Sequence, residues 1–287
     1  MPGLTAEPWQ ACPVERNERS NAFLLSWAEG VLREALHRSP LLDARQFEIF
    51  GQGSRVNNTY IEPASDIDLV LMLKPPPASK LDETDFSRNN WAEFRDDVLA
   101  ALGESYVVRM GRRCVNVDDP DSLFGEMVDI LVATEHRRYP VPGARRYEQG
   151  VYFRDREGRP IVNFPKQHRR NGDEKDLRTG GRFKQVVRAA KRVRRLAERD
   201  RMIADGAAPS YLLECLLYNV PDHIYRRASL GAAYRGALEW LRWCHREDPL
   251  SFAGLPCQNG INRLFGAGPD QWAAGGAGRI VDVLHEI

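Results

Sequence analysis

The sequence predicts an α/β (α+β) protein with a mixed sheet in its first part and a lobe of helices in its second. Before residue 160, short stretches alternate apolar with polar residues, which is typical of strands, and stretches of helical periodicity lie between them. After about residue 160, apolar residues recur at helical spacing. We therefore expect a core over residues 1–160 and a helical lobe over residues 161–287.

The elements of the first part follow from periodicity and from residues that end elements. A long N-terminal helix is predicted over 14–37. Its apolar residues on one side are Phe23, Leu24, Trp27, Val31, Leu32 and Leu36. Strands are predicted at 46–50, 66–73 and 126–134, a helix at 88–102, and a hairpin around Gly111. Prolines at 75–77 end the second strand, because proline cannot donate to a strand ladder.

The second part is expected to contain one strongly amphipathic helix and several more apolar ones. The amphipathic helix spans 181–201, with apolar residues along one side. Opposite them lies a narrow cationic stripe formed by Lys184, Arg188, Lys191 and Arg195. An apolar helix begins at Pro209-Ser210 and ends at Val220-Pro221, and two further helices are expected at 228–246 and 278–286.

Composition is that of an ordinary globular protein. The chain has 287 residues, of which 43% are hydrophobic and 28% charged. It contains no apolar run of about 18 residues, and its N-terminus lacks the pattern of a secretory signal, so we expect a cytoplasmic protein. Neither a disulfide framework nor a zinc site is expected, because the cysteines are widely scattered. They are Cys12, Cys114, Cys215, Cys244 and Cys257.

Charge is distributed unevenly along the chain. The net charge is +1, yet residues 166–201 hold 14 Lys or Arg against 5 Asp or Glu. A cationic segment within a nearly neutral protein indicates a local anionic ligand such as phosphates. It does not indicate general affinity for nucleic acid or membranes, so we expect no membrane association and no stable nucleic-acid partner.

Three aspartates predict a metal site. Asp66 and Asp68 are one residue apart in a segment of period-two alternation, so both side chains project from one face of a strand. Asp129 occupies the polar face of a later strand. Neighbouring carboxylates repel each other unless a cation lies between them, and oxygen ligands suit a divalent metal. The alternative is that these are three surface acids on exposed sheet faces.

The spacing of these acids resembles that of the nucleotidyltransferase superfamily, which includes DNA polymerase β, poly(A) polymerases and oligoadenylate synthases. Eleven residues separate the Gly53-Ser54 pair from Asp66. The resemblance implies two Mg²⁺ or Mn²⁺ ions held by Asp66, Asp68 and Asp129, with Asp129 on the side of the attacking hydroxyl. It also implies that Gln52, Gly53 and Ser54 bind the triphosphate, since glycine permits close approach of the backbone.

Two later segments narrow the resemblance to the bacterial cGAS/DncV-like nucleotidyltransferases. They are IVNFPKQHRRNGDEKDLRTGGRFKQVVRAAKR and PSYLLECLLYNVP. The resemblance assigns triphosphate binding to Ser210 and to Lys184, Arg188 or Lys191. The alternatives are a solvated face for the stripe and a plain helix N-cap for Ser210. Tyr211 is a candidate for base stacking, or else an aromatic of the core or its rim.

Asn163 is the residue expected to recognise a base. Its position resembles that of an asparagine in the branch that makes cyclic dipyrimidines, which implies UTP as a substrate. A carboxamide offers both a donor and an acceptor, as O4 and N3–H of uracil require. The alternative is that Asn163 fixes the bend before Phe164-Pro165. We expect His168, nearby, to be structural.

The function expected from these features is template-independent synthesis of a cyclic dinucleotide second messenger for anti-phage signalling. Ribonucleoside triphosphates are the expected substrates, pyrophosphate the leaving group, and the cleft between core and lobe the expected site. A regulatory partner protein is compatible with this function. The rival interpretations are a nucleotidyltransferase with a macromolecular acceptor, RNA or protein, and a non-catalytic nucleic-acid-binding protein.

Overall fold

The structure is a computed structural model that describes residues 18–62, 66–76, 83–118, 128–141 and 144–287. The chain divides into two compact units. The core unit holds the described residues of 18–56 and 66–166, and the helical unit holds 57–62 and 167–287. Residues 57–62 therefore pack with the second unit although they lie within the first part of the sequence.

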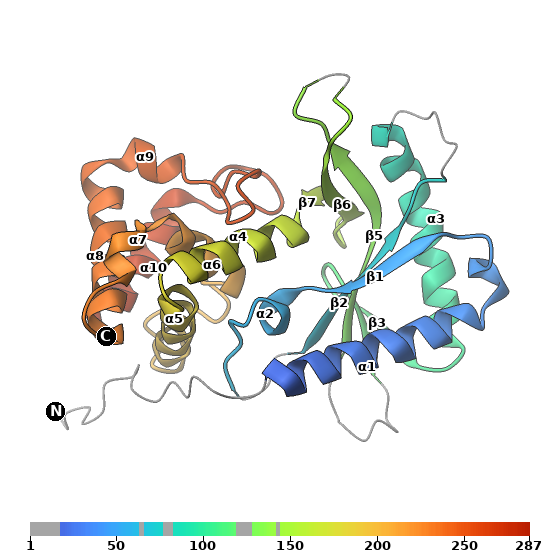
Figure 1. Cartoon of the computed structure of the whole chain (residues 1–287), viewed down its shortest axis with the longest axis horizontal. Helices are drawn as coiled ribbons and strands as arrows, with labels where there is room; N and C mark the ends of the chain where they lie inside the picture. Colours follow the sequence, from blue (N-terminus) through green and yellow to red (C-terminus); the bar gives the residue numbers. More distant parts are fainter. Residues whose placement is uncertain (1–17, 63–65, 77–82, 119–127, 142–143) are drawn as a thin grey trace. The chain divides into compact units, whose positions relative to one another are not determined.

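A sheet of seven strands forms the centre of the core unit (Figure 1). The strands are β1 (Phe47–Gly51), β2 (Ile67–Leu73), β3 (Val107–Met110), β4 (Val115–Asp118), β5 (Val128–Arg138), β6 (Glu148–Arg154) and β7 (Pro160–Asn163). The order β1-β2-β5-β4-β3 contains one parallel pair, β2 with β5. The first half of β5 pairs with β4, and its second half pairs with β6. Strand β6 in turn pairs with β7.

Helices cover one face of this sheet. The alternating residues of β2 and β5 pack there against α1 (Glu18–His37) and α3 (Glu83–Gly103), as Figure 1 shows. A short 3-10 helix, η1 (Pro40–Leu42), and a four-residue helix, α2 (Gly53–Val56), precede and follow β1. The predicted side of α1 is only partly correct, because Phe23 is 61% exposed while Leu32 and Leu36 are buried.

The opposite face of the sheet is apolar at one end and polar at the other. Val70 of β2 and Leu131 of β5 join a smaller core with residues of β6 and β7. Asp68 and Asp129 occupy the same face two residues earlier on each strand, because side chains alternate with period two. The acids therefore lie where the apolar cluster on this face ends.

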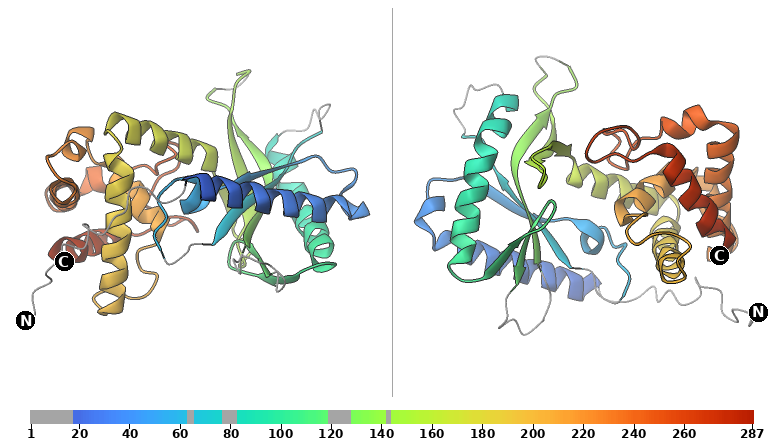
Figure 2. Two further views of the ribbon diagram at one scale, coloured as in Figure 1. Left: turned by 60° about the horizontal axis from the view of Figure 1, so that its bottom comes forward. Right: turned by 180° about the vertical axis from the view of Figure 1, so that it is seen from behind.

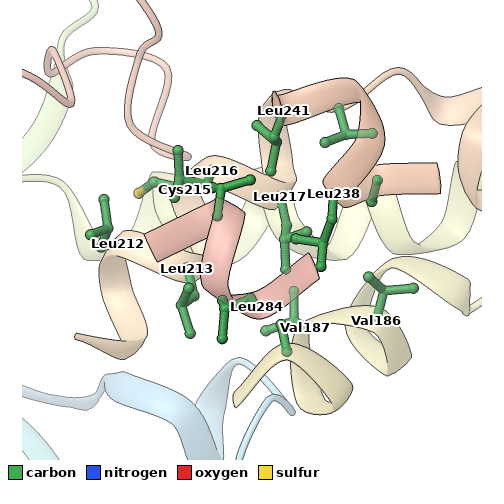
Figure 3. Close-up of a cluster of buried hydrophobic side chains, with 14 of the residues drawn as sticks. Val186, Val187, Leu212, Leu213, Cys215, Leu216, Leu217, Leu238, Leu241 and Leu284 are labelled. Carbon is green, nitrogen blue, oxygen red and sulfur yellow. The ribbon is translucent and has the colours of Figure 1, made fainter. Parts of the chain in front are cut away.

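The helical unit contains seven helices in the described part of the chain. They are α4 (Pro165–Arg178), α5 (Arg182–Arg199), α6 (Ser210–Asn219), α7 (Asp222–Tyr225), α8 (Leu230–Glu247), α9 (Pro249–Ala253) and α10 (Ala274–Glu286). Figure 2 shows them from two further sides, and α5 and α8 pack against each other and both against α7 and α10. Their buried side chains form one continuous core, in which Val187, Leu216 and Leu284 come from three different helices (Figure 3).

Most predicted elements are confirmed, and two strands were missed. The hairpin around Gly111 is β3–β4, and the predicted helices of the second part correspond to α5, α6, α8 and α10. No prediction covered β6 or β7, and β5 is longer than expected. Residues 14–17 of the first helix, 126–127 of the third strand and Pro77 lie outside the described residues.

Two further features of the described residues concern the cysteines and the apolar character of the helices. Cys114, Cys215, Cys244 and Cys257 are free thiols, while Cys12 lies outside the described ranges. Within those ranges no helix combines the length and the apolar character that crossing a bilayer requires.

Candidate active site

Two catalytic candidates lie side by side on adjacent parallel strands. Asp68 of β2 is the register partner of Asp129 of β5, so their side chains project from the same face. Asp66 lies just before β2 and is exposed. Its charge reaches Asp129 and raises the pKa of that carboxyl. The three acids that the sequence singled out thus belong to one end of one sheet face.

The pKa of Asp129 lies above its ordinary value. Burial is the main cause that raises the pKa of Asp129, and the charge of Asp66 adds to it. A hydrogen bond from Asn116 Nδ2 to Asp129 Oδ1, 2.5 Å long, acts in the opposite direction. Nearby, burial together with the charges of Asp129 and Asp68 raises the pKa of the Cys114 thiol to about 12.

Asn116 is a site residue that sequence reasoning missed. It lies on β4 as the register partner of Asp129, and its amide orients that carboxylate. The signal was present in the segment VNVD, where Val115 and Val117 are buried and Asn116 therefore lies on the opposite face. The hairpin was predicted, but its register against β5 depends on long-range pairing.

Gly53 lies directly against β2. Its φ of 76° is in the left-handed region that favours glycine. A Cβ atom added to it would coincide with the carboxylate of Asp68. The backbone N–H of Gln52 donates to the carbonyl oxygen of Asp68 at 2.9 Å, which fixes the turn to the strand. Ser54 follows in α2. The Gly-Ser turn and the acids are therefore one local structure.

The donor set suits divalent cations. Across the described ranges, no three His, Cys, Asp or Glu side chains converge closely enough to hold one metal ion. Yet Asp68 and Asp129 are in register, and the pKa of Asp129 is raised partly by the charge of Asp66, a repulsion that a cation would relieve. Hard oxygen ligands of this kind match Mg²⁺ and Mn²⁺. Closer approach of the three carboxylates would accompany binding.

Asn163 lies on the same sheet face as the acids. Asn163 is the register partner of Val151 on β6, and Val151 is the register partner of Glu135 on β5. Glu135 follows Asp129 by six residues on the same strand, an even number, so the side chains lie on one face. The Oδ1 atom of Asn163 accepts a hydrogen bond from the backbone N–H of Phe164 at 2.8 Å. That bond agrees with the alternative that Asn163 fixes the local bend, and base recognition stays a prediction.

The solvated-face alternative is wrong for Lys184 and Lys191 of the cationic stripe, whereas Arg188 and Arg195 are half-buried. Lys191 is 2% exposed, and Lys184 is also buried. Lys184 forms an ion pair with Asp173, whose side chain is exposed. Arg188 Nη1 donates to the carbonyl oxygen of Asn58 at 2.6 Å. The stripe is thus engaged by protein groups within the helical unit.

Lys191 belongs to a buried polar cluster that the sequence did not predict. Its Nζ lies 2.6 Å from Glu214 Oε1, and His168 Nε2 lies 2.9 Å from Glu214 Oε2. Burial alone would raise the pKa of Glu214, but the charge of Lys191 and the hydrogen bond from His168 outweigh it and lower that pKa. The structural role expected for His168 is therefore confirmed.

Two predicted nucleotide-binding residues lie at the beginning of α6. The helix begins at Ser210 with Pro209 as its N-cap and no side-chain capping bond, so the plain N-cap alternative for Ser210 is wrong. The ring of Tyr211 stacks on that of His168 at 4.9 Å and on that of Trp272 at 6.0 Å. Triphosphate binding by Ser210 and base stacking by Tyr211 stay predictions.

Known proteins resemble this chain both in the helical unit and over most of its length. Residues 170–287 match the C-terminal helical domain of the cGAS/DncV-like nucleotidyltransferases. A cyclic UMP-AMP synthase of Rhodothermus marinus is 32% identical over 259 residues, with 84% of each chain covered. A cyclic dipyrimidine nucleotide synthase, CdnE, of Cecembia lonarensis is 34% identical over 214 residues, with 69% of each chain covered.

The fold comparison covers nearly the whole chain. The solved structure of the Rhodothermus marinus CdnE c-UMP-AMP synthase with Apcpp and Upnpp aligns with a TM-score of 0.77 at 30% sequence identity. The alignment covers 98% of this chain and 94% of that one. Both the sequence relatives and the fold therefore confirm the resemblance indicated by the motifs. The chain belongs to the cGAS/DncV-like nucleotidyltransferases, a family that includes cyclic dinucleotide synthases.

Proposed function

We propose that this protein joins two ribonucleoside triphosphates, one of them UTP, into a cyclic dinucleotide that signals phage infection. The observation that carries the proposal is the register of Asp68 with Asp129, with the backbone of Gly53 against the Asp68 carboxylate. Support for UTP comes from relatives named as cyclic UMP-AMP and cyclic dipyrimidine synthases. Both names include a uridine or another pyrimidine nucleotide.

The chemistry proposed is in-line attack of a nucleotide hydroxyl on the α-phosphate of a second nucleotide. Two bound divalent cations would be held by Asp66, Asp68 and Asp129, and they would stabilise the attacking oxygen and the departing pyrophosphate. Asp129, on the side of the attacking hydroxyl, is proposed to accept the proton of that hydroxyl. Asn116 holds that carboxylate in one orientation through its amide.

Triphosphate binding is proposed for the Gly-Ser turn in the core unit. Gln52, Gly53 and Ser54 are tied to the acids by the bond from the Gln52 N–H to the Asp68 carbonyl. Because no side chain projects from Gly53, phosphate oxygens would approach the backbone there without steric hindrance. The Ser54 hydroxyl is proposed as a further donor to the phosphates.

In the helical unit, the contacts favour Lys184 over Lys191 as a phosphate ligand. Lys184 pairs with Asp173, an exposed carboxylate that a triphosphate would displace at small cost. Lys191 is buried with Glu214, and withdrawing it would leave a buried carboxylate unpaired. Arg188 and Ser210 complete the proposed set, with Tyr211 as the proposed stacking partner of a base.

Base selection is proposed for Asn163. The carboxamide of Asn163 carries a donor, its Nδ2 group, which is proposed to meet the O4 of uracil. Replacing Asn163 by alanine should lower the use of UTP relative to the other triphosphates. The measurement is the ratio of products formed from an equimolar mixture of all four ribonucleoside triphosphates.

The experiment that tests the function is incubation of the purified protein with these four triphosphates and Mg²⁺ or Mn²⁺. Products are treated with phosphatase and identified by mass spectrometry. A phosphatase-resistant cyclic dinucleotide that contains uridine, and that disappears with Asp68→Asn, is the expected result. Pyrophosphate release without a cyclic product would instead support transfer to a macromolecular acceptor. If no product forms and no pyrophosphate is released under any of these conditions, the proposal is overturned.

A further inference from the structure

Residues 57–62, which we call the connector, join two groups of proposed site residues along the chain. On one side the connector follows Val56, the last residue of α2, which begins at Gly53. On the other side the chain continues to Asp66 and β2. The connector packs with the helical unit, whereas both neighbouring elements belong to the core unit. Whatever holds the connector therefore restrains the backbone that leads to both groups.

The carboxylate of Glu214 is the centre of the contacts that hold the connector. Glu214 is 4% exposed, and it accepts hydrogen bonds from Thr59 Oγ1 at 2.7 Å and Asn57 Nδ2 at 3.3 Å. Lys191 Nζ contacts the same carboxylate and lies 3.0 Å from both the hydroxyl and the carbonyl oxygen of Thr59. With His168 Nε2, four side chains fill about all the acceptor sites that a carboxylate offers.

This cluster is electrically balanced. The Nδ1 atom of His168 is buried and has no hydrogen-bond partner among the described residues. The Nε2 atom of the same ring lies 2.9 Å from Glu214 Oε2, so His168 faces the carboxylate through one nitrogen only. Glu214 and Lys191 compensate each other. A saturated cluster has no capacity left for a metal ion or a phosphate, and its donors serve the connector instead.

The stripe on α5 adds a second set of contacts, directed at the connector backbone. Arg188 Nη1 donates to the carbonyl oxygen of Asn58 at 2.6 Å, and Arg195 Nη1 to that of Glu62 at 2.7 Å. The φ angle of Asn58 is 54°, in the left-handed region that few non-glycine residues occupy. Such a conformation persists where its surroundings fix it. The connector is thus held in one backbone conformation along most of its length.

We propose that Glu214 is a positioning residue for nucleotidyl transfer, acting through Asn57 and Thr59. The inference rests on the proposed function and adds a residue to it that touches neither substrate nor metal. A displacement of about 1 Å between reacting groups costs on the order of a hundredfold in rate. Loosening the connector should therefore lower kcat more than it raises KM, because the backbone on its two sides, at α2 and at Asp66, is then held less firmly.

The test compares two buried threonines of the helical unit. Thr59→Val removes the hydroxyl that bonds Glu214 and leaves the Glu214–Lys191 pair intact. Thr179→Val is the matched control, because Thr179 is equally buried and its hydroxyl donates to the Lys175 carbonyl oxygen at 2.8 Å. Both variants should lower the melting temperature by similar amounts. Only Thr59→Val should lower kcat, by about tenfold with KM within about twofold, and Thr59→Ser should restore it.

Hydrogen exchange at the amides of Gly53 and Asp68 gives a readout that does not depend on the product. Faster exchange there in Thr59→Val, but not in Thr179→Val, supports the positioning role even if the protein yields no cyclic nucleotide and the proposed function fails. Unchanged exchange, or equal loss of kcat in both valine variants, overturns it. Asn57→Ala, which removes the second donor to Glu214, takes the place of Thr59→Val if that variant does not fold.

Discussion

The acid end of the core sheet and the Glu214 cluster of the helical unit are two carboxylate clusters of opposite character. Burial and the nearby charge of Asp66 raise the pKa of Asp129, and the hydrogen bond from the neutral amide of Asn116 offsets this only in part. Glu214 is more deeply buried, yet Lys191 and His168 compensate it and lower its pKa. Within one protein, burial alone therefore does not decide the state of a carboxylate, and its partners do.

This difference separates a ligand site from a structural one. A saturated cluster such as that of Glu214 stabilises the fold only as long as both charges are present. The acid end, by contrast, is held together by strand pairing despite the repulsion of its side chains. Adding a cation should stabilise the acid end and leave the Glu214 cluster unchanged.

Replacing Asp129 by asparagine should have the largest effect on activity. Without that carboxylate, pyrophosphate release should fall by about a thousandfold or more, since both a metal ligand and a proton acceptor are lost. The melting temperature without metal should stay equal to that of the wild type or rise, because a repelling charge is removed. Calorimetry with and without Mg²⁺ or Mn²⁺ checks the prediction on stability. The metal should raise the melting temperature of the wild type but not that of Asp129→Asn. A marked loss of stability in the metal-free variant would contradict the comparison.

Gly53→Ala should have the next largest effect. The added methyl group would coincide with the Asp68 carboxylate, and alanine is strained at a φ of 76°. We expect kcat to fall by about a hundredfold, comparable to a displacement of about 1 Å in the reacting groups. Gly180→Ala is the control, because Gly180 has a φ of 63° and no neighbour near its added Cβ. Equal activity of the two variants would contradict a specific role for the approach of Gly53 to Asp68.

Glu214→Gln should act chiefly on stability. It leaves the Lys191 ammonium buried without its counter-charge, which typically costs about 3–5 kcal/mol. Urea denaturation measures this loss directly. The double variant Glu214→Gln/Lys191→Met should recover part of it, because the unpaired charge is then removed as well. If Lys191→Met destabilised the Glu214→Gln protein as much as it destabilises the wild type, the two residues would not form a compensated pair.

Local patterns in the sequence were sufficient for the acid end. Alternation in DIDLVLML places Asp68 on the face opposite Leu69, which is confirmed. The backbone of Gly53 lies against Asp68, whereas its approach to a triphosphate stays a prediction. The resemblance to the family is also confirmed by relatives that cover most of the chain. These features depend on residues close together in sequence.

The Glu214 cluster could not be predicted in this way. Its members come from the connector, α4, α5 and α6, so they meet only through tertiary packing. Within the sequence, Glu214 is one acid in an otherwise apolar helix, YLLECLLYN, and that exception was the available signal. A charge on the buried side of a helix requires a partner. The cationic stripe across α5 supplies it, although the stripe itself suggested only phosphate binding or exposure to solvent.

The pH dependence of stability gives the finest test of the comparison, because the two carboxylates should contribute slopes of opposite sign. The pKa of Glu214 is lowered by folding, so its contribution is fully present above its unfolded pKa of about 4.3 and is lost as pH falls below that value. The difference in unfolding free energy between wild type and Glu214→Gln should therefore shrink by about 1.4 kcal/mol per pH unit below about pH 4. The pKa of Asp129 is raised by folding, so its ionisation destabilises the metal-free protein as pH rises. Asp129→Asn should accordingly exceed the wild type in stability at pH 7 and approach it as pH falls. Urea titrations of the three proteins at several pH values between about 3.5 and 7 measure both slopes. Slopes of the same sign would contradict the comparison, because both carboxylates would then be stabilised by folding or both destabilised by it.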